Sequence, residues 1–412
     1  MSSAPGTDGT MPPRPNRPLA SITVIDFGQI YQGPYATLLM AKAGADVIKV
    51  EPVGTGEPLR VRAAAAKGAG MPFAMLNSNK RAVTLNLKDD RGKDLLKRLV
   101  AKADVLLENF TPDVMNKLGV GWEVLKAINP RLIYASGSGY GLSGPNRDWM
   151  AMDLTVQASS GIMSVTGMPD GPPLKCGAAV VDFMSGIHLY AAVMTALYER
   201  SVTGRGRLVE VSMLESVFPA LASNLGMAYS QDGAVPPRTG NRHGGLSVSP
   251  YNVYEAKDGH VAINVVKDIH FEGLLRIMGR EDLIGDERFV TNKARVAHME
   301  ETDGLVEAWT RTKTRAEILK LATQHRLPVA PVRDLVEVMN DPHMHERGTL
   351  EWLDHPVFGR IVVPTTPLKV HGAEKVETVP SPSIGQHNAE VYGDWLGLGA
   401  EEIAALEADG VI

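Results

Sequence analysis

Residues 22–50 read ITVIDFGQIYQGPYATLLMAKAGADVIKV, and this stretch decides the fold. Its first five residues form a short apolar run ending at Asp26, which is typical of a buried strand. Pro34 suits the first turn of a helix, and apolar residues then recur at the helical i, i+3, i+4, i+7 spacing until Gly44. Residues 45–50 follow as a second strand. The stretch therefore predicts a β-α-β unit, in which two parallel strands are joined by a right-handed crossover.

The same alternation continues along the chain. Further strands are predicted at 105–107, 131–136 and 207–213, with helices at 91–103 and 120–128. The first 215 residues are therefore expected to form a doubly wound, Rossmann-like α/β domain.

A second, smaller domain is expected further along the chain. Residues 251–266 alternate around a turn at Asp258-Gly259, which predicts a β-hairpin, and amphipathic helices follow to about Gln324. The segment from Leu327 to Pro331 is expected to begin a return segment. The expected ranges are a disordered tail at 1–17, a large α/β domain at 18–224, a small α+β domain with linkers at 225–330 and a return segment at 331–412.

Composition narrows the class of protein. The 412 residues are 44% hydrophobic, which is ample for two cores. With 42 basic and 47 acidic residues the net charge is −5, so no nucleic-acid surface is indicated. Cys176 is the sole cysteine, which excludes intrachain disulfides and a Cys-rich zinc site. No apolar run approaches the ~20 residues of a membrane helix, and residues 1–17 do not resemble a signal peptide. We therefore expect a soluble, cytoplasmic protein without membrane partners.

Asp182 is the leading catalytic candidate. The apolar residues 177–181 before it suggest a strand, and a long apolar helical stretch, 187–198, follows it. Backbone N–H groups at the start of a helix favour a negative charge, and an ionised carboxylate can attack a reactive acyl group. The alternative is that Asp182 only caps the helix.

Other motifs carry less information. Residues 139–144, GYGLSG, match G-x-G-x-x-G, but they do not follow the first strand or open a helix, so a nicotinamide dehydrogenase is disfavoured. Asp153 is either a second acid in the site of Asp182 or a helix cap. Residues 238–245, RTGNRHGG, are either a surface turn or an anion clamp with a flexible lid. Residues 77–81, NSNKR, with Lys88 form a basic cluster that suits a phosphate-bearing ligand or a solvated face.

Several of these segments occur together in one known family. They are Asp26-Phe27 with Gly33-Pro34, residues 44–51 (GADVIKVE), residues 77–81 (NSNKR), residues 106–110 (LLENF), Gly139-Tyr140, residues 203–206 (TGRG) and residues 238–243 (RTGNRH). In this order and spacing, from about Leu19 to the C-terminus, the chain resembles the class III CoA-transferase family, which includes formyl-CoA transferase and carnitine CoA-transferase.

The resemblance implies a mechanism and a fold. The carboxylate of Asp182 would attack an acyl-CoA thioester to form a mixed anhydride, and CoA would then form an aspartyl-CoA thioester. The segment Gly244-Gly245 would be the mobile glycine loop that excludes water from these intermediates. The fold would be an interlocked, ring-like homodimer in which both ends of each chain build the large, CoA-binding domain. Coenzyme A or acyl-CoA would be a substrate, with no metal or permanently bound cofactor.

The resemblance also assigns the ligand contacts. The residues that correspond to CoA contacts are Leu85, Lys88, Asn109, Phe110, Lys117 and Leu118. The substrate loops would include Tyr31, Asp153, Arg242, His243, Gly244 and Gly245. Four positions depart from formyl-CoA transferase: Met150 replaces a lysine, Met152 a tyrosine, Asp153 a glutamate and Tyr31 an active-site glutamine. These departures argue against formyl-CoA and oxalate as the substrate pair.

Three functions stay open. The first is a CoA-transferase, with succinyl-CoA as donor and a dicarboxylate as acceptor, because Arg238, Arg242 and His243 could bind a second carboxylate. The second is an α-methylacyl-CoA racemase or epimerase, which needs a His before the acid where this chain has Met152. The third is a CoA-binding protein without catalysis.

Overall fold

The computed structural model describes residues 16–62, 70–230 and 238–412, which form two compact units. The first unit contains the described chain up to Met152 together with Val181–Ser216 and Pro342–Ile412. The second contains Asp153–Val180 and Val217–Asp341. Residues 153–180 fall within the range expected for the large domain, 18–224, but in the structure they pack with the second unit. The tail expected at 1–17 lies outside the described residues except for Asn16 and Arg17, and the Asn16 carbonyl accepts a hydrogen bond from the Glu374 N–H (2.8 Å).

The first unit is built on a six-stranded parallel sheet. Its strands are β1 (Thr23–Asp26), β2 (Asp46–Glu51), β3 (Arg81–Thr84), β4 (Val105–Glu108), β5 (Ile133–Ser138) and β6 (Leu208–Ser212). Its helices before the C-terminal segment are α1 (Gln32–Lys42), α2 (Leu59–Arg62), α3 (Met71–Leu76), α4 (Asp90–Val100), α5 (Val114–Lys117), α6 (Trp122–Ile128), α9 (Val180–Thr203) and α10 (Met213–Val217).

The strand order is β3-β2-β1-β4-β5-β6, so the direction of winding reverses between β1 and β4. In register, Ile25 lies between Ile48 of β2 and Leu106 of β4. The predicted mixed α/β fold with a parallel sheet is confirmed. The strand predicted at 177–181 is wrong: residues 177–179 are irregular and α9 already begins at Val180. The apolar residue Val181 is buried as part of that helix rather than in a sheet.

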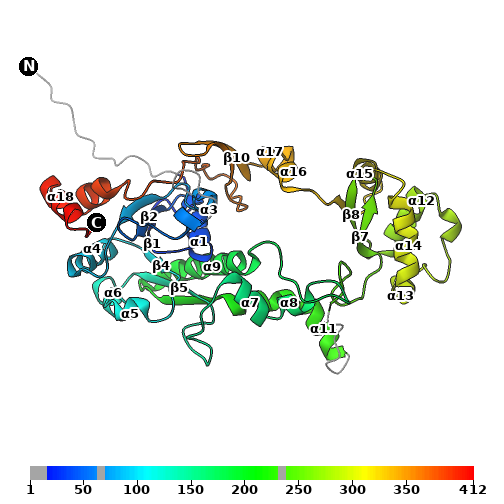
Figure 1. The fold of residues 1–412 in the computed structure, drawn as a ribbon, viewed down its shortest axis with the longest axis horizontal. Helices are drawn as coiled ribbons and strands as arrows, with labels where there is room; N and C mark the ends of the chain where they lie inside the picture. The colour runs from blue at the N-terminus through cyan, green and yellow to red at the C-terminus, as the bar shows by residue number, and fades with distance from the viewer. Residues whose placement is uncertain (1–15, 63–69, 231–237) are drawn as a thin grey trace, which may run out of the picture. The chain divides into compact units, whose positions relative to one another are not determined.

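Helices cover both faces of this sheet (Figure 1). On one face, α1 and α9 pack Met40, Leu189 and Val193 against the strands. On the other face, α4 and α6 contribute Leu96, Leu99 and Leu125, which lie among side chains of β1 to β5. Both faces are therefore buried, which explains why strand residues are apolar in runs rather than in alternation.

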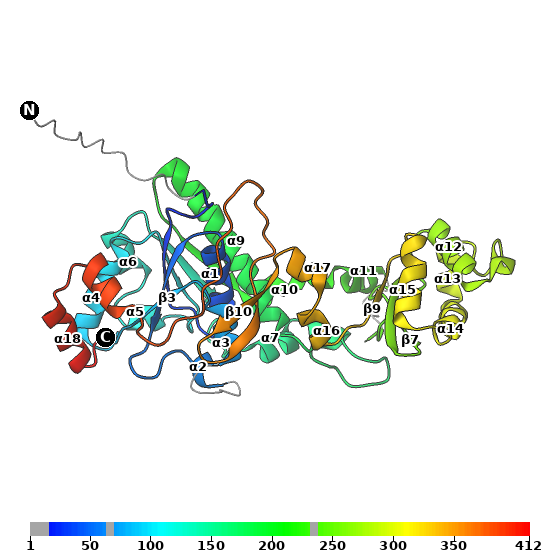
Figure 2. The ribbon, with the colours of Figure 1, turned by 90° about the horizontal axis from the view of Figure 1, so that it is seen from above.

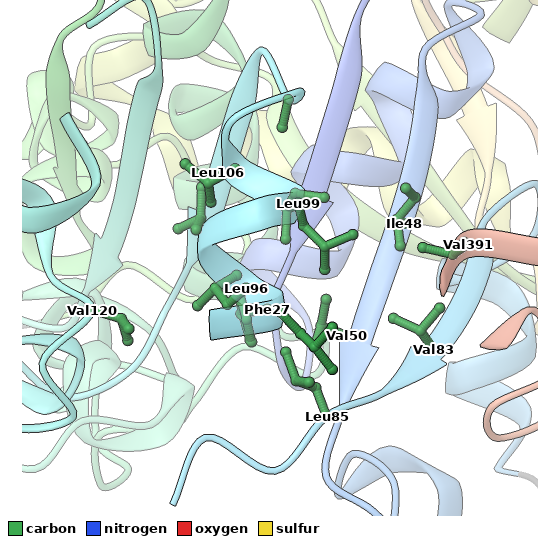
Figure 3. Close-up of a cluster of buried hydrophobic side chains, with 14 of the residues drawn as sticks. Phe27, Ile48, Val50, Val83, Leu85, Leu96, Leu99, Leu106, Val120 and Val391 are labelled. Atoms are coloured by element: carbon green, nitrogen blue, oxygen red, sulfur yellow. The ribbon is translucent and has the colours of Figure 1, made fainter. Parts of the chain in front are cut away.

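The C-terminal segment completes the first unit. It contains α17 (Pro342–Glu346), β10 (Leu350–His355), β11 (Gly359–Pro364), a π-helical segment η3 (Ala389–Trp395) and α18 (Ala400–Ala408). Figure 2 shows β10 near α3, and β11 packs its Ile361 and Val363 against Ala74 of α3. Figure 3 shows Val391 of η3 beside Val83 and Ile48 in the core. Residues more than 300 positions apart thus share one core.

The second unit has a three-stranded antiparallel sheet, β7 (Tyr251–Ala256), β8 (Gly259–Asn264) and β9 (Val329–Pro331). Its helices are α7 (Asp153–Ser159), α8 (Ile162–Val165), η1 (Phe218–Leu221), α11 (Ala222–Ser230), α12 (Asp268–Met278), η2 (Glu281–Leu283), α13 (Asn292–Ala297), α14 (Met299–Thr310), α15 (Arg315–Gln324) and α16 (Leu335–Met339). The hairpin is where the pattern predicts it. The segment expected to begin the return instead forms β9, which pairs with β8.

Helix α9 is the one described helix that is long and apolar enough to cross a bilayer by length and composition. No apolar run of this length is predicted from the sequence, and in α9 the polar residues Asp182, His188, Glu199 and Arg200 interrupt the apolar residues. The core helix of a globular protein can have the same length and apolar composition. Helix α9 packs as such a helix, because Leu189, Val193 and Ala196 are buried against the sheet.

Candidate active site

A cavity of about 290 Å³ lies in the first unit at the carboxyl ends of the parallel strands. Loops after β1, β4 and β5 line it, together with Pro58, Asp182 and Met213. The winding of the sheet reverses between β1 and β4, and ligands of doubly wound proteins bind in the crevice that this reversal leaves. The topology therefore places a binding site where the cavity is found.

Asp182 lines this cavity from the first turn of α9. Its side chain is buried, with 8% of the residue exposed. A Cβ on Gly186, one turn later, would lie 2.8 Å from the Gln32 carbonyl oxygen, so glycine lets α9 approach the start of α1 closely. Asp182 is thus a carboxylate at a helix N-terminus that also faces a cavity, which a simple cap does not require.

The loop after β1 forms the floor beside Asp182. The Asp26 carboxylate accepts the Gly28 N–H (2.7 Å) and thereby turns the chain as it leaves β1. A Cβ on Gly28 would lie 2.8 Å from the Gly33 carbonyl carbon, and one on Gly33 would lie 2.7 Å from the Gly28 Cα. The two glycines therefore allow the loop to fold back on itself.

A buried ion pair holds this loop. Lys80 Nζ lies 3.0 Å from Asp26 Oδ2, and both side chains are fully buried. Burial raises the pKa of Asp26, but Lys80, Lys49 and the Thr37 hydroxyl outweigh it and bring this pKa below its usual value. Burial lowers the pKa of Lys80 to about 8, against the opposing effect of Asp26, so the ammonium group is protonated at neutral pH.

The suggested role of residues 77–81 in binding phosphate therefore needs correction. Lys80 points into the core, and Arg81 pairs with Asp46 (2.5 Å) and Glu390 (2.8 Å). The two cations are adjacent in the sequence, but successive side chains of an extended chain point in opposite directions. Lys80 therefore enters the core, whereas Arg81 lies near the surface. Lys88 is exposed and stays a predicted CoA contact.

The rest of the loop is held by hydrogen bonds between its backbone and the side chains of Glu57 and Asn109. Ile30 has a φ of +63°, which is strained for a β-branched residue, and its N–H donates to Glu57 (3.2 Å). Asn109 accepts the Gln29 N–H (2.7 Å) and donates to the Gln29 carbonyl (3.0 Å). The two cavity loops are thus clamped together, and Asn109 supports the shape of the site.

Tyr31 packs beside the site rather than lining the cavity. Its ring stacks on Phe183 with centroids 5.7 Å apart, and Tyr35 meets the other side of Phe183 edge-on at 4.9 Å. These rings fix the residue after Asp182 and so the direction of the first turn of α9. The predicted substrate role of Tyr31 stays a prediction.

Glu108, at the end of β4, has a raised pKa of about 7 because it is buried, although hydrogen bonds from Ser136, the Phe110 N–H and Tyr134 act against the rise. Glu108 Oε2 accepts the Phe110 N–H at 2.8 Å, so this carboxyl group helps to hold the loop that lines the cavity.

We expect Glu108→Gln to remove a pH dependence of stability. The folded-state pKa of Glu108 lies above its ordinary value of 4.5, so the folded protein binds more protons than the unfolded chain between these values. The free energy of unfolding therefore falls as pH rises from about 4.5 to about 7, by about 1–3 kcal/mol in total. Gln resembles the protonated carboxyl, so the variant should match the wild type near pH 4 and exceed it at pH 8. Urea unfolding at several pH values measures this, and equal pH slopes for the two proteins would contradict it.

The other predicted CoA contacts differ in their settings. Asn109 and Phe110 line the cavity. Lys117 is exposed, Leu118 packs partly buried against the core, and Leu85 belongs to the core with 4% exposed. The structure brings two of the six residues to the cavity, and the CoA role of all six stays a prediction.

The remaining predicted substrate residues lie in the second unit. Gln157 donates to Asp153 within α7 (2.5 Å). Arg242 is bound by Glu300 (2.7 Å) and Asp303 (2.8 Å), and these carboxylates raise its pKa.

His243 and the two glycines fold against α11 of the same unit. His243 Nδ1 accepts the Gly245 N–H (3.1 Å), and Gly244 lies against Asn224. Their substrate roles stay predictions.

Sequence reasoning missed most of the cavity lining. Gln29, Ile30 and Gln32 follow β1, and Arg147 and Trp149 lie in the loop after β5. A signal was present, because residues after parallel strands gather at one edge of the sheet. Met150 and Met152, noted as departures from the family, also line the cavity and are exposed.

Comparison with known proteins identifies the family of this chain. The model of the family described as CoA-transferase family III matches residues 19–388. The chain is 36% identical to formyl-CoA:oxalate CoA-transferase of Streptomyces avermitilis, covering 96% of this chain and 99% of that protein. It is 34% identical to succinyl-CoA–D-citramalate CoA-transferase of Chloroflexus aurantiacus, covering 97% and 99%. A crystal structure of a CaiB/BaiF family protein from Brucella suis matches with a TM-score of 0.81 and 32% identity, covering 92% and 99%. The chain therefore belongs to CoA-transferase family III and is an acyl-CoA:carboxylate CoA-transferase of class III.

Proposed function

We propose that Asp182 carries an acyl group and then CoA during the transfer. The observation that carries this proposal is the buried carboxylate of Asp182, which lines the cavity from the first turn of α9. Backbone N–H groups at this position favour the ionised form, which is the nucleophile. Asp182 is the acid that the family resemblance assigns to this step.

In the first half of the reaction, an oxygen of Asp182 adds to the thioester carbon of the donor acyl-CoA. The carbon–sulfur bond breaks, CoA leaves as a thiolate, and a mixed anhydride stays on Asp182. The thiolate then adds to the Asp182 carbonyl carbon and releases the donor acid as a carboxylate. The product is an aspartyl-CoA thioester, and the acceptor carboxylate reverses the same two steps. No redox partner or net proton is needed, because one carboxylate and one thioester are exchanged for another pair.

We further propose that CoA lies along the loop after β4, with its thioester at the cavity. Asn109 and Phe110 already line that cavity. Lys88 and Lys117 are exposed cations that could bind the phosphates, while Leu85 and Leu118 would flank the adenine. Loop Arg242–Gly245, with Asp153, would contribute to the acceptor side and to the exclusion of water.

For the substrates, we propose succinyl-CoA as donor and a dicarboxylate as acceptor. The two relatives named above carry oxalate and D-citramalate in their names, both dicarboxylic acids, and one carries succinyl-CoA. Arg242 is a weaker clamp than the sequence suggests, because Glu300 and Asp303 already neutralise it. Arg238 and His243 are therefore the preferred partners of the second carboxylate.

A homodimer in the cytoplasm is part of the proposal, with interlocked chains as the family resemblance implies. Helix α9 supports the presence of a partner surface. Three large side chains at helical spacing, Ile187, Tyr198 and Val202, are exposed along it at 48%, 75% and 74%.

A matrix of acyl-CoA donors against carboxylic acids, read by mass detection of the new CoA ester, tests the substrate proposal. We expect succinyl-CoA with a C4–C6 dicarboxylate to give the highest kcat/KM. The control is the same acyl-CoA in D₂O without an acceptor, where deuterium uptake at the α-carbon would indicate a racemase instead. A best pair made of monocarboxylates would contradict the dicarboxylate assignment while leaving CoA transfer in place.

A further inference from the structure

Gln32 belongs to the wall of the cavity, and its buried amide nitrogen, Nε2, has no hydrogen-bond partner among the described residues. It is the first residue of α1, only 2% of it is exposed, and it lines the same cavity as Asp182. Buried amides in proteins are nearly always paired, so this one stands out.

The surroundings make room for this side chain. A Cβ on Gly137, in β5, would lie 2.6 Å from Gln32 Oε1 and 2.8 Å from its Cδ. Glycine at 137 therefore leaves a space that the amide fills. At the other end of the residue, the Gln32 carbonyl lies against Gly186, one turn after Asp182. Two glycines from distant segments thus accommodate the side chain and the backbone of the same residue.

Two other polar side chains of the cavity wall have partners within the protein. The Asn109 amide both donates to and accepts from the Gln29 backbone. Arg147 forms an ion pair with Asp113; its Nε has no hydrogen-bond partner in the described part of the chain, but 30% of this side chain is exposed. Gln32 combines burial of more than nine-tenths with an N–H donor that no described residue accepts, and it lines the same cavity as Asp182. Leaving such a donor unpaired destabilises the folded protein. A group of this kind persists where function requires it.

We propose that Gln32 Nε2 donates a hydrogen bond to the thioester carbonyl oxygen while Asp182 attacks. This proposal rests on the nucleophilic role of Asp182 stated above. As the carbon–oxygen bond to Asp182 forms, the carbonyl electron pair moves onto that oxygen, and the amide N–H stabilises the negative charge. When the tetrahedral centre collapses, the pair returns, the carbon–sulfur bond breaks and CoA leaves as the thiolate. Gln32 gains and loses no proton.

The test is the variant Gln32→Met, which keeps the length of the side chain and removes the donor. We expect kcat to fall about 10²–10³-fold, the loss seen when one donor to an oxyanion is removed. The KM for acyl-CoA should stay within about threefold, because the contact strengthens only in the transition state. The melting temperature should stay the same or rise, since an unpaired buried donor has been removed.

Asn129→Leu is the matched control. Asn129 precedes β5, at the end of the strand opposite the cavity, and its amide is fully paired: it donates to the Val100 and Ala103 carbonyls and accepts the Arg131 N–H. This variant should lose thermal stability and keep its kcat, which is the reverse of the Gln32→Met pattern. A purely structural role for Gln32 predicts the same pattern for both variants.

Two outcomes would overturn the proposal. One is a folded Gln32→Met protein with wild-type kcat. The other is a rise in KM with unchanged kcat, which would make Gln32 a contact for ground-state CoA. Hydroxylamine trapping in the wild type distinguishes a failure of the Gln32 proposal from a failure of the nucleophile assignment. If Asp182 is the nucleophile, hydroxylamine labels it after acyl-CoA is added. If Asp182 is not the nucleophile, no label appears on it.

Discussion

The variant Asp182→Ala is expected to lose CoA transfer, with a fall in kcat of at least about 10⁴-fold, while CoA still binds. The reason is that the alanine methyl group cannot form the anhydride or the thioester, and no other group in the proposed mechanism replaces it. Binding should persist because the proposed CoA contacts lie on the loop after β4 and on the segments around Leu85 and Lys117. Steady-state turnover with mass detection measures the first effect, and calorimetric titration with CoA measures the second.

Asp334→Ala is the matched control for this experiment. Asp334 caps α16 by accepting the Glu337 N–H (2.8 Å), so it performs the role that Asp182 would have if it were only a cap. Loss of this cap should lower stability by about 0.5–2 kcal/mol and leave the rate of CoA transfer unchanged. If Asp182→Ala shows the same pattern, with turnover retained, Asp182 is a capping residue and the nucleophile assignment is wrong.

Lys80→Met should lower the free energy of unfolding by about 3–5 kcal/mol. Lys80 and Asp26 are both fully buried and 3.0 Å apart, and Lys80 also donates to Thr37 and Asn77. Removing the ammonium leaves the Asp26 carboxylate buried without its main counter-charge. Because Asp26 also binds the Gly28 N–H, the loop that lines the cavity should loosen as well. Urea unfolding measures the loss.

Two further variants test whether the stability loss in Lys80→Met comes from the unpaired buried charge of Asp26 or from lost packing. Arg81→Met removes the adjacent cation, which pairs with Asp46 and Glu390 near the surface, and should lower the free energy of unfolding by about 1 kcal/mol or less. The double variant Asp26→Asn/Lys80→Met removes both charges of the buried pair and should be more stable than Lys80→Met alone. Equal losses for Lys80→Met and Arg81→Met, or no recovery in the double variant, would show that the buried charge is not the cause.

Local patterns predicted the elements of the first unit well. The strand after Ile22, the helix that Pro34 helps to start and its end at Gly44 are observed within one or two residues, because each depends on neighbours in the chain. The apolar residues before Asp182 are predicted as a strand, and this prediction is wrong because α9 already begins at Val180. A short apolar run fits a buried helix start as well as a strand, and only the packing of α9 on the sheet distinguishes them.

The amino-acid sequence by itself determined the alternation of strands and helices, and it placed Asp182 at the start of a helix. Periodicity and turn residues carry that information because they act over a few positions. Only the tertiary structure decided that Lys80 is a core residue rather than a phosphate ligand, and that Gln32 shares a cavity with Asp182. The physical reason is that these environments are built by partners 54 and about 150 positions away, and no local pattern specifies which distant groups will meet.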